Sequence, residues 1–276
     1  MEISNLSRKR ISSYLREGKR FDGRKLHDLR EIEIETNISK NAEGSARVKI
    51  GDTEVIAGVK LDVVEPYPDN EDEGTLVTSA ELLPLSSPRF EAGPPKIEAI
   101  ELARVVDRGI RESNFIDFKK LCIKKGEKVW GIFIDIYTIN DDGNLIDASC
   151  LAAVTALKTA KMPKYDEKKE SINHDELTNK PLPLSESIPI NLTFFKIGES
   201  IIVDPVREEE DSSDARLSLA LTKDKEIMIN SIQKGNEEPL SEEEISNILE
   251  IATEKFKLLE KKIKEEIGKL LKTKSK

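Results

Sequence analysis

The sequence has few of the residues that build metal and disulfide sites. Its 276 residues include two cysteines, Cys122 and Cys150, and two histidines, His27 and His174. The cysteines lie in apolar segments, and none of the four residues has the spacing of a zinc site or a CxxC motif. We therefore expect no disulfide framework, no metal site and no other cofactor, in a reducing compartment.

Long apolar runs are also missing. No segment is long enough to cross a membrane, and the first ten residues, MEISNLSRKR, lack the apolar stretch of a signal peptide. We therefore expect a cytoplasmic protein with no membrane partner. The length permits one large domain or two smaller ones, each with a sizeable core.

Positive charge is in deficit, with 44 Lys and Arg against 53 Asp and Glu, a formal charge of −9. The balance is uneven, because residues 1–30 hold nine basic and four acidic side chains (9 − 4 = +5) while acidic clusters occupy 69–73 and 208–214. An acidic total argues against general adhesion to nucleic acid, and we expect no DNA partner. Any polyanion site on this chain must be local.

One segment has the features of such a local site. Residues 98–113 (EAIELARVVDRGIRES) follow a Pro-Pro turn and predict a helix. Helical residues are ~100° apart, so Arg104, Arg108 and Arg111 share one face while aliphatic residues fill another. The segment therefore predicts a row of guanidinium groups on a packed helix, which suits phosphate recognition.

A simpler interpretation of the same helix has to be weighed. Glu101, Asp107 and Glu112 lie within one turn of the arginines and could form ordinary surface ion pairs with them. Each such pair contributes only ~0.3–0.5 kcal/mol and needs no ligand. The helix alone leaves both interpretations open.

The chain begins with sheet-forming sequence. Alternation and turn residues predict a short helix, a strand, a hairpin around Gly51, two further strands and a small-residue helix. The corresponding ranges are 6–17, 32–35, 45–61, 75–85, 129–139 and 147–160.

The second half repeats part of this plan. Residues 162–189 contain four prolines amid polar sequence and predict a linker between halves, which we place as 1–187 and 188–276. KIGESIIVD (196–204) is similar to KIGDTEVIA (49–57), and whether this reflects a duplication is left open. A capping box at Ser241 and Glu244 starts a long final helix.

Taken together, four motifs resemble the RNase PH family: RFDGR (20–24), GSARVKIGDTEVIAGVK (44–60), RVVDRGIR (104–111) and DDGN (141–144). The resemblance implies an α+β fold of two similar βαβα-type halves, with mixed sheets packed against helices. It also implies assembly into six-membered rings around a pore that admits single-stranded RNA. Catalytic members of this family degrade RNA from its 3′ end by phosphorolysis.

Three further segments, 81–95, 100–108 and 202–210, resemble the non-catalytic RNase PH-like subunits of archaeal exosomes. This implies heterodimers with a catalytic RNase PH-like subunit, three per hexameric ring, together with RNA-binding cap subunits and single-stranded RNA as partners. RFDGR is interpreted as a structural turn in which Asp22 pairs with a neighbouring arginine.

The chain departs from the catalytic pattern at the phosphate site. Catalytic relatives place Gly, Ser or Thr, and Arg at the start of the small-residue helix, whereas this chain has Gly143, Asn144 and Leu145. Leucine neither donates a hydrogen bond nor offsets phosphate charge. We therefore expect a degenerate phosphate site, no catalytic residues, and no RNA turnover by this chain alone.

The arginine helix then gains a role through the resemblance. Active sites of the ring lie at subunit boundaries, so Arg104 and Arg108 are expected to bind RNA phosphates beside a neighbour's active site, with Arg111 partly held by an acid on its own helix. Two alternatives stay open. One is an active phosphorolytic exoribonuclease whose phosphate site uses Asn144 and backbone amides, and the other is an RNA-binding module that forms no ring.

Overall fold

The computed structural model of the chain describes residues 3–166 and 171–273, and within these the side chain of His174 lies outside the described residues. In chain order the elements are α1 (Asn5–Arg16), β1 (Ile32–Thr36), β2 (Gly44–Ile50), β3 (Thr53–Val64), β4 (Thr75–Leu82), α2 (Ile97–Arg111), the 3-10 helix η1 (Phe118–Leu121), β5 (Cys122–Lys124), β6 (Lys128–Asn140), α3 (Leu145–Thr159), β7 (Lys161–Asp166), β8 (Ser171–Pro181), β9 (Ile190–Ile197), β10 (Ser200–Val203), α4 (Arg207–Asp211), β11 (Ala215–Lys223), β12 (Ile227–Gly235) and α5 (Glu242–Thr273).

The first sheet has the order β1-β2-β3-β6-β4, with β5 paired to the end of β6. Its pairs are antiparallel except for β4, which runs parallel to β6. The predicted hairpin around Gly51 is confirmed as β2 and β3, and Gly51 has a φ of +57°. A left-handed φ of this kind favours glycine in a tight turn.

The second sheet has the order β10-β9-β11-β12. The predicted hairpin at residues 196–204 is confirmed as β9 and β10, with Gly198 in the turn. All its pairs are antiparallel, so this half lacks the parallel pair that a mixed sheet would require. Hairpins join β9 to β10 and β11 to β12, and the α4 connection carries the chain from β10 to β11 on the other side of β9, so every paired neighbour runs in the opposite direction.

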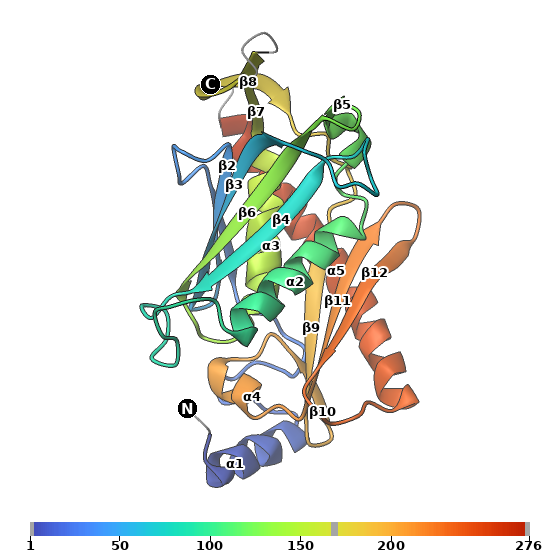
Figure 1. Cartoon of the computed structure of the whole chain (residues 1–276). Coiled ribbons are helices and arrows are strands. Elements are labelled where there is room, and N and C mark those ends of the chain that lie inside the picture. The colour runs from blue at the N-terminus through green and yellow to red at the C-terminus, as the bar shows by residue number, and fades with distance from the viewer. Residues whose placement is uncertain (1–2, 167–170, 274–276) are drawn as a thin grey trace.

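Helix α3 lies between the two sheets, where it packs on β2 and β3 on one side and β9 on the other (Figure 1). Thirteen of its fifteen residues are buried, so it has no solvated face. Its alanines allow close approach, and one continuous hydrophobic core extends from β1 through α3 to α5. Helix α2 packs on β4 and α3 and reaches β12.

Residues 162–189 differ from the predicted polar linker. Most of them form the antiparallel pair β7 and β8, a two-stranded sheet whose register shifts on both sides of Pro163. Proline lacks an amide donor, so it interrupts the ladder without preventing the hairpin. The prediction of a linker is therefore wrong for the residues of β7 and β8, and residues 182–189 connect β8 to β9.

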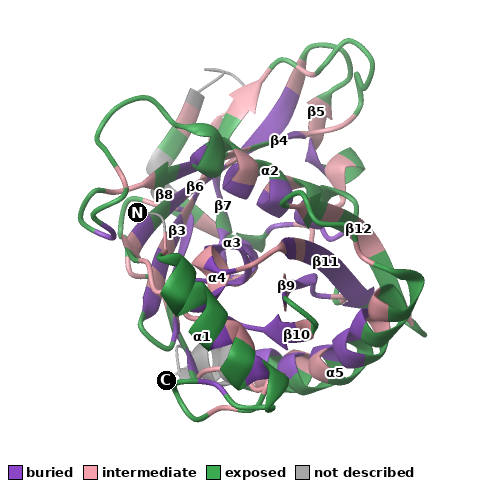
Figure 2. Ribbon diagram, turned by 90° about the horizontal axis from the view of Figure 1, so that it is seen from below, coloured by how far each residue is buried: buried purple, intermediate pink, exposed green. Residues whose placement is uncertain are grey.

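The two terminal helices were placed by their sequence patterns within one or two residues. The capping box of α5 is confirmed: the Ser241 amide donates to Glu244 at 2.8 Å and the Glu244 amide donates to Ser241 Oγ at 3.2 Å. Figure 2 shows α1 on the surface, largely exposed, while Ile11 and Leu15 on its inner side join a small cluster with β9 and β10. Among the described helices, none has the length and apolar character that a membrane span requires.

Candidate functional site: an arginine ridge and a closed anion site

We use the name arginine ridge for Arg104, Arg108 and Arg111, the exposed cations of α2. The inner face of α2 is aliphatic and buried against β4 and α3, which fixes the ridge toward solvent. The predicted helix and its shared arginine face are thus both present. What distinguishes the three guanidinium groups is their pairing.

Arg111 is held internally. It pairs with Asp107 at 3.0 Å and donates to the Leu76 carbonyl at 3.0 Å. Its guanidinium also lies 5.9 Å from the ring centre of Phe118. The expectation that an acid on the same helix restrains Arg111 agrees with this geometry.

Arg104 and Arg108 have no hydrogen-bond or ion-pair partner among the described residues. Of the acids that could have neutralised them, Glu101 instead pairs with Arg216 of β11 and Asp107 pairs with Arg111. The simple interpretation of the helix as a row of internal ion pairs therefore applies only to Arg111. Two exposed guanidinium groups are left available to an external anion on a chain whose total charge is negative.

Gly143, Asn144 and Leu145 form the entrance to α3, as the sequence predicts. Gly143 has a φ of +82° and Asn144 a φ of +59°, so the chain turns sharply into the helix. A side chain on Gly143 would lie 2.7 Å from the Pro205 carbonyl, so the turn also packs directly against the segment before α4. Leu145 is buried and offers no polar group.

Two of the amides at this entrance are already bonded to carboxylates of the chain itself. The Gly143 amide donates to Asp141 at 3.2 Å, and the Asn144 amide donates to Glu210 Oε2 at 2.7 Å. The positive end of a helix is where a phosphate would bind. Here Glu210 stands in the place of that anion, so we describe this as a closed anion site.

The surrounding charges do not favour a second anion. A cavity of about 430 Å³ lies between α2, the start of α3 and α4, and its lining includes three arginines and four carboxylates. These are Arg89, Arg207 and Arg216, with Glu98, Glu101, Glu210 and Asp211. Each arginine has a carboxylate partner: Asp211 for Arg89, Asp141 and Asp211 for Arg207, and Glu101 for Arg216.

Arg207 shows how the carboxylates neutralise an arginine of this cavity. Burial lowers the pKa of its guanidinium, but Glu210 and Asp211 more than offset this and leave the pKa raised. Its charge is therefore matched inside the protein and unavailable as a phosphate clamp. Two residues of the acidic cluster that the sequence indicated at 208–214, Glu210 and Asp211, thus form ion pairs with Arg207 near the start of α3.

The two arginines of RFDGR are bonded within the protein, in agreement with the predicted structural role of this turn. Arg20 is buried and donates to Glu209 Oε1 at 2.9 Å and to the Val203 carbonyl at 3.0 Å. Arg24 pairs with Asp22 at 2.7 Å, and the Arg24 amide donates to the same carboxylate. This turn joins the N-terminal segment to the second half.

Two residues that sequence reasoning missed complete this junction. Arg30 donates to Asp204 Oδ1 at 2.7 Å and to the Gly143 carbonyl at 3.1 Å. Burial raises the pKa of the Asp204 carboxyl, but the hydrogen bonds and charge of Arg30 outweigh it and leave the pKa lowered. Asn144 adds a side-chain bond to Asp204 at 2.9 Å. No local pattern in the sequence marks Arg30, because its partners are far along the chain.

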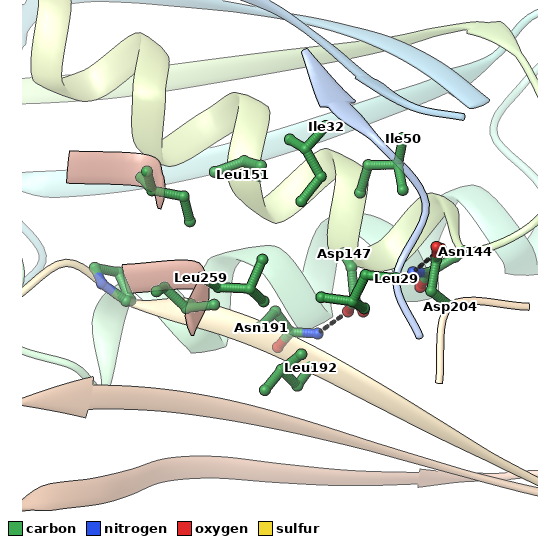
Figure 3. Close-up of a pocket in the computed structure, with 13 residues that line it drawn as sticks. Leu29, Ile32, Ile50, Asn144, Asp147, Leu151, Asn191, Leu192, Asp204 and Leu259 are labelled. Atoms are coloured by element: carbon green, nitrogen blue, oxygen red, sulfur yellow. Dashed lines mark hydrogen bonds between the residues drawn. The ribbon is translucent and has the colours of Figure 1, made fainter. Parts of the chain in front are cut away.

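Asp147 is a third missed residue, and its lone charge in an apolar helix was the available signal. It accepts from the Thr193 amide at 3.0 Å, Thr193 Oγ1 at 2.7 Å and Asn191 at 2.9 Å. Figure 3 shows it beside a small internal cavity of about 30 Å³. Burial raises the pKa of its carboxyl to about 6, although the three donors oppose the shift.

No group of three or more His, Cys, Asp or Glu side chains within the described part of the chain is arranged to hold a metal ion. Cys150 is buried, and burial raises the pKa of its thiol well above the usual range, which makes it inert.

Protein-family models and known proteins match most of this chain. Residues 28–163 match the 3′ exoribonuclease family, domain 1, and residues 187–255 match its domain 2. The exosome complex component Rrp42 of Methanosarcina acetivorans is 46% identical over 253 residues, covering 92% of this chain and 91% of that protein. The Rrp42 component of Thermococcus kodakarensis is 45% identical over 271 residues, covering 98% of each chain.

Solved structures of archaeal exosome chains are also similar to this chain. A chain of the Archaeoglobus fulgidus exosome with RNA bound to the active site superposes with a TM-score of 0.85 at 42% identity, covering 94% of this chain and 98% of that one. A chain of an archaeal exosome core gives 0.81 at 39% identity, covering 94% and 97%. The two matched domains, the α+β fold and these relatives together show that the chain belongs to the RNase PH family of 3′ exoribonucleases, in the branch of the archaeal exosome components.

Proposed function

We propose that this chain is a non-catalytic subunit of an archaeal exosome, a ring that degrades RNA from its 3′ end by phosphorolysis. In that ring it pairs with a catalytic RNase PH-like subunit, as three heterodimers, and the ring carries RNA-binding cap subunits. The chain holds single-stranded RNA beside the partner's active site and performs no chemistry itself.

One contrast carries the proposal: Glu210 occupies the anion site at the start of α3, whereas two arginines of α2 are free. Phosphorolysis requires a phosphate ion to be held against an anionic RNA backbone, which calls for unpaired donors and cations. At the start of α3 the Asn144 amide is bonded to Glu210, and Leu145 is buried and apolar. This supports loss of catalysis.

The arginine ridge supports retention of RNA contact. Arg104 and Arg108 are exposed and have no partner in the described part of the chain. A phosphate backbone is the polyanion that such guanidinium groups recognise, without sequence preference. Because Arg111 is paired with Asp107, we assign it the smaller share of RNA binding.

The test is phosphate-dependent shortening of a 3′-labelled single-stranded RNA. We would measure this chain alone, the catalytic RNase PH-like subunit of the same organism alone, and the two mixed. We expect no release of nucleoside diphosphate by this chain, and activity chiefly in the mixture. Release by this chain alone would replace the proposal with the active exoribonuclease.

The ridge is tested in the mixed assembly. Arg104→Ala/Arg108→Ala should raise the Kd for RNA about tenfold or more, because each lost phosphate contact removes a charge-assisted bond. The mass of the assembly should not change, since neither side chain has an internal partner. Unchanged RNA affinity in this variant would refute the role of the ridge.

A further inference from the structure

The proposed function leaves the basic N-terminal segment without a role. Residues 1–30 carry a net charge of +5 on a chain whose total is −9. Most of the nine basic side chains are paired with carboxylates of the chain itself, namely Arg8, Arg16, Lys19, Arg20, Arg24 and Arg30. Lys9, Arg10 and Lys25 have no ion-pair partner among the described residues.

Two of these unpaired cations lie on the outer face of α1. Ile11 and Leu15 pack against β9 and β10, and Lys9 and Arg10 are exposed. Helical residues are ~100° apart, so burial of the first two side chains turns the two cations toward solvent. Figure 1 shows α1 below α4 and β10, apart from α2. The two cations are therefore separate from the arginine ridge.

Two exposed aromatic rings lie beside Arg10. Tyr14 of α1 and Phe21 of the RFDGR turn are 37% and 47% exposed, and their ring centres are 4.6 Å apart. The Arg10 guanidinium lies 5.9 Å from the first ring centre and 5.5 Å from the second. We use the name aromatic platform for Tyr14, Phe21 and Arg10. The rings keep these exposed fractions with Arg10 in place, so they are open to a further flat group.

The backbone on which the two rings stand is anchored. Arg20 precedes Phe21, is buried, and donates to Glu209 at 2.9 Å. Leu15 follows Tyr14 and is also buried. The platform joins a helix to a fixed turn, so little conformational entropy is lost when a ligand orders it.

The nearest acids along the chain do not oppose an anion at the platform. Glu17 pairs with Lys19, and Asp22 pairs with Arg24. Exposed aromatic rings stack on nucleobases, and unpaired cations bind phosphates. An unpaired nucleotide presents both groups together, so it matches the chemistry of this surface.

We propose that the aromatic platform, with Lys9, is a second contact for single-stranded RNA. An unpaired base stacks on Tyr14 and Phe21, and the adjoining phosphates bind Lys9 and Arg10. This rests on the proposed function, in which the chain holds RNA, and it adds a contact that is separate from the arginine ridge. Every base has a π face, so the contact selects single strands without selecting a sequence.

The first experiment measures binding of a fluorescein-labelled ten-nucleotide oligoadenylate to the full-length chain by fluorescence anisotropy. The platform variant, Tyr14→Ala/Phe21→Ala, should raise the Kd about tenfold, because stacking is lost while every charge is kept. The matched control is Tyr14→Phe/Phe21→Tyr, which keeps both rings and should bind like the wild type. Wild-type affinity in the platform variant would overturn the inference.

A second measurement keeps the chain unchanged. An oligomer of ten abasic ribose phosphates carries the charge of oligoadenylate without its bases, and the wild type should bind it about tenfold more weakly. The platform variant should largely lose this difference. Equal binding of the two oligomers by the wild type, or no measurable binding of oligoadenylate, would overturn the inference.

Other occupants of the platform would show themselves in the same variant. If it lost binding to phosphatidylglycerol vesicles, or lost the ring mass in the mixture with the catalytic subunit, while binding RNA like the wild type, a membrane or a protein would occupy the platform. Either result would overturn the inference.

The two proposals fail separately. If the platform variant binds RNA like the wild type while nucleoside diphosphate is released chiefly by the mixed assembly, the platform assignment is wrong and the proposed function stands. If this chain alone releases nucleoside diphosphate while the platform variant loses RNA affinity, the proposed function is wrong and the platform assignment stands.

Discussion

Glu210 shows how a single side chain can close a site. Its carboxylate accepts the Asn144 amide at 2.7 Å, at the helix end where a relative that binds phosphate needs a free donor. The chain has Leu145 where the family resemblance implies an arginine, and Glu210 places a negative charge at the same helix end. Both changes act in the same direction, so restoring arginine at position 145 alone would leave a competing anion in place.

At the same scale, Asp147 predicts a dependence of stability on pH. Its carboxyl has a pKa of about 6 in the folded chain against 3.8 unperturbed. Between these values the folded state holds a proton that the unfolded state has lost, so the free energy of unfolding falls as pH rises from ~4 to ~6. The expected loss is about 3 kcal/mol.

Urea unfolding of the wild type and Asp147→Asn between pH 4 and 7 isolates this group, because every other titration is common to both. The stability advantage of the wild type should shrink across the window and stay constant above pH 6.5. A difference that is independent of pH would show that Asp147 stays ionised in the folded protein.

Among the elements, α3 depends on close contact with β2. Gly44 of β2 lies against the end of α3, where an added Cβ would be 2.3 Å from the Ala156 carbonyl and 2.7 Å from Ala160. Nothing in the local sequence of β2 indicates this, because the neighbour lies more than a hundred residues later. The small residues of α3 and this glycine together allow the helix to sit between the sheets.

Gly44→Ala should therefore destabilise the protein by about 2–3 kcal/mol, since both clashing groups are backbone and cannot move without shifting the helix. Gly58→Ala on the adjacent β3 is the matched control. Its Cβ would meet only Ala42, at 3.9 Å, and alanine is favoured over glycine within a strand. Thermal unfolding of both variants checks this, and equal stabilities would contradict the close packing.

Some secondary-structure elements could be predicted from sequence patterns alone. Gly51 and Gly198 mark two hairpins, and Ser241 and Glu244 mark the start of α5, because turn and cap chemistry involve residues close in sequence. Pro163 was read as part of a linker and instead lies in β7. Whether a segment pairs as a hairpin depends on both strands, and the polar composition of β8 concealed the second.

For the whole molecule, the distribution of charge matters more than its total of −9. Most arginines near the junction of the halves, such as Arg20, Arg30 and Arg207, are paired inside. Attraction of RNA is therefore expected to come from a few exposed cations, which makes it sensitive to salt and to individual substitutions.

RNA binding by the mixed assembly should become less dependent on salt when the ridge is removed. Two lost phosphate contacts should reduce the slope of log K against log salt by about 1.4 for a single strand. Lys257→Ala/Lys261→Ala on the exposed side of α5 makes the same change in total charge and serves as the control. Equal slopes for the two double variants would mean that total charge, and not the ridge, controls binding.

The sequence by itself determined what depends on neighbours along the chain: the hairpins, the caps, the amphipathic α2 and the apolar residue at position 145. It also carried the resemblance that the family comparison confirmed, while the division at residues 187 and 188 stays a prediction. Periodicity, turns and caps are local, so their physical causes can be read in order.

Only the tertiary structure decided which charges are free. From the sequence Glu101, Asp107 and Glu112 were equivalent partners for the arginines, but the fold assigns Glu101 to Arg216 and Asp107 to Arg111. It likewise brought Glu210 to the Asn144 amide across 66 residues. The energy of an ion pair depends on distance and solvent exposure in space, and neither quantity is encoded at the positions that form it.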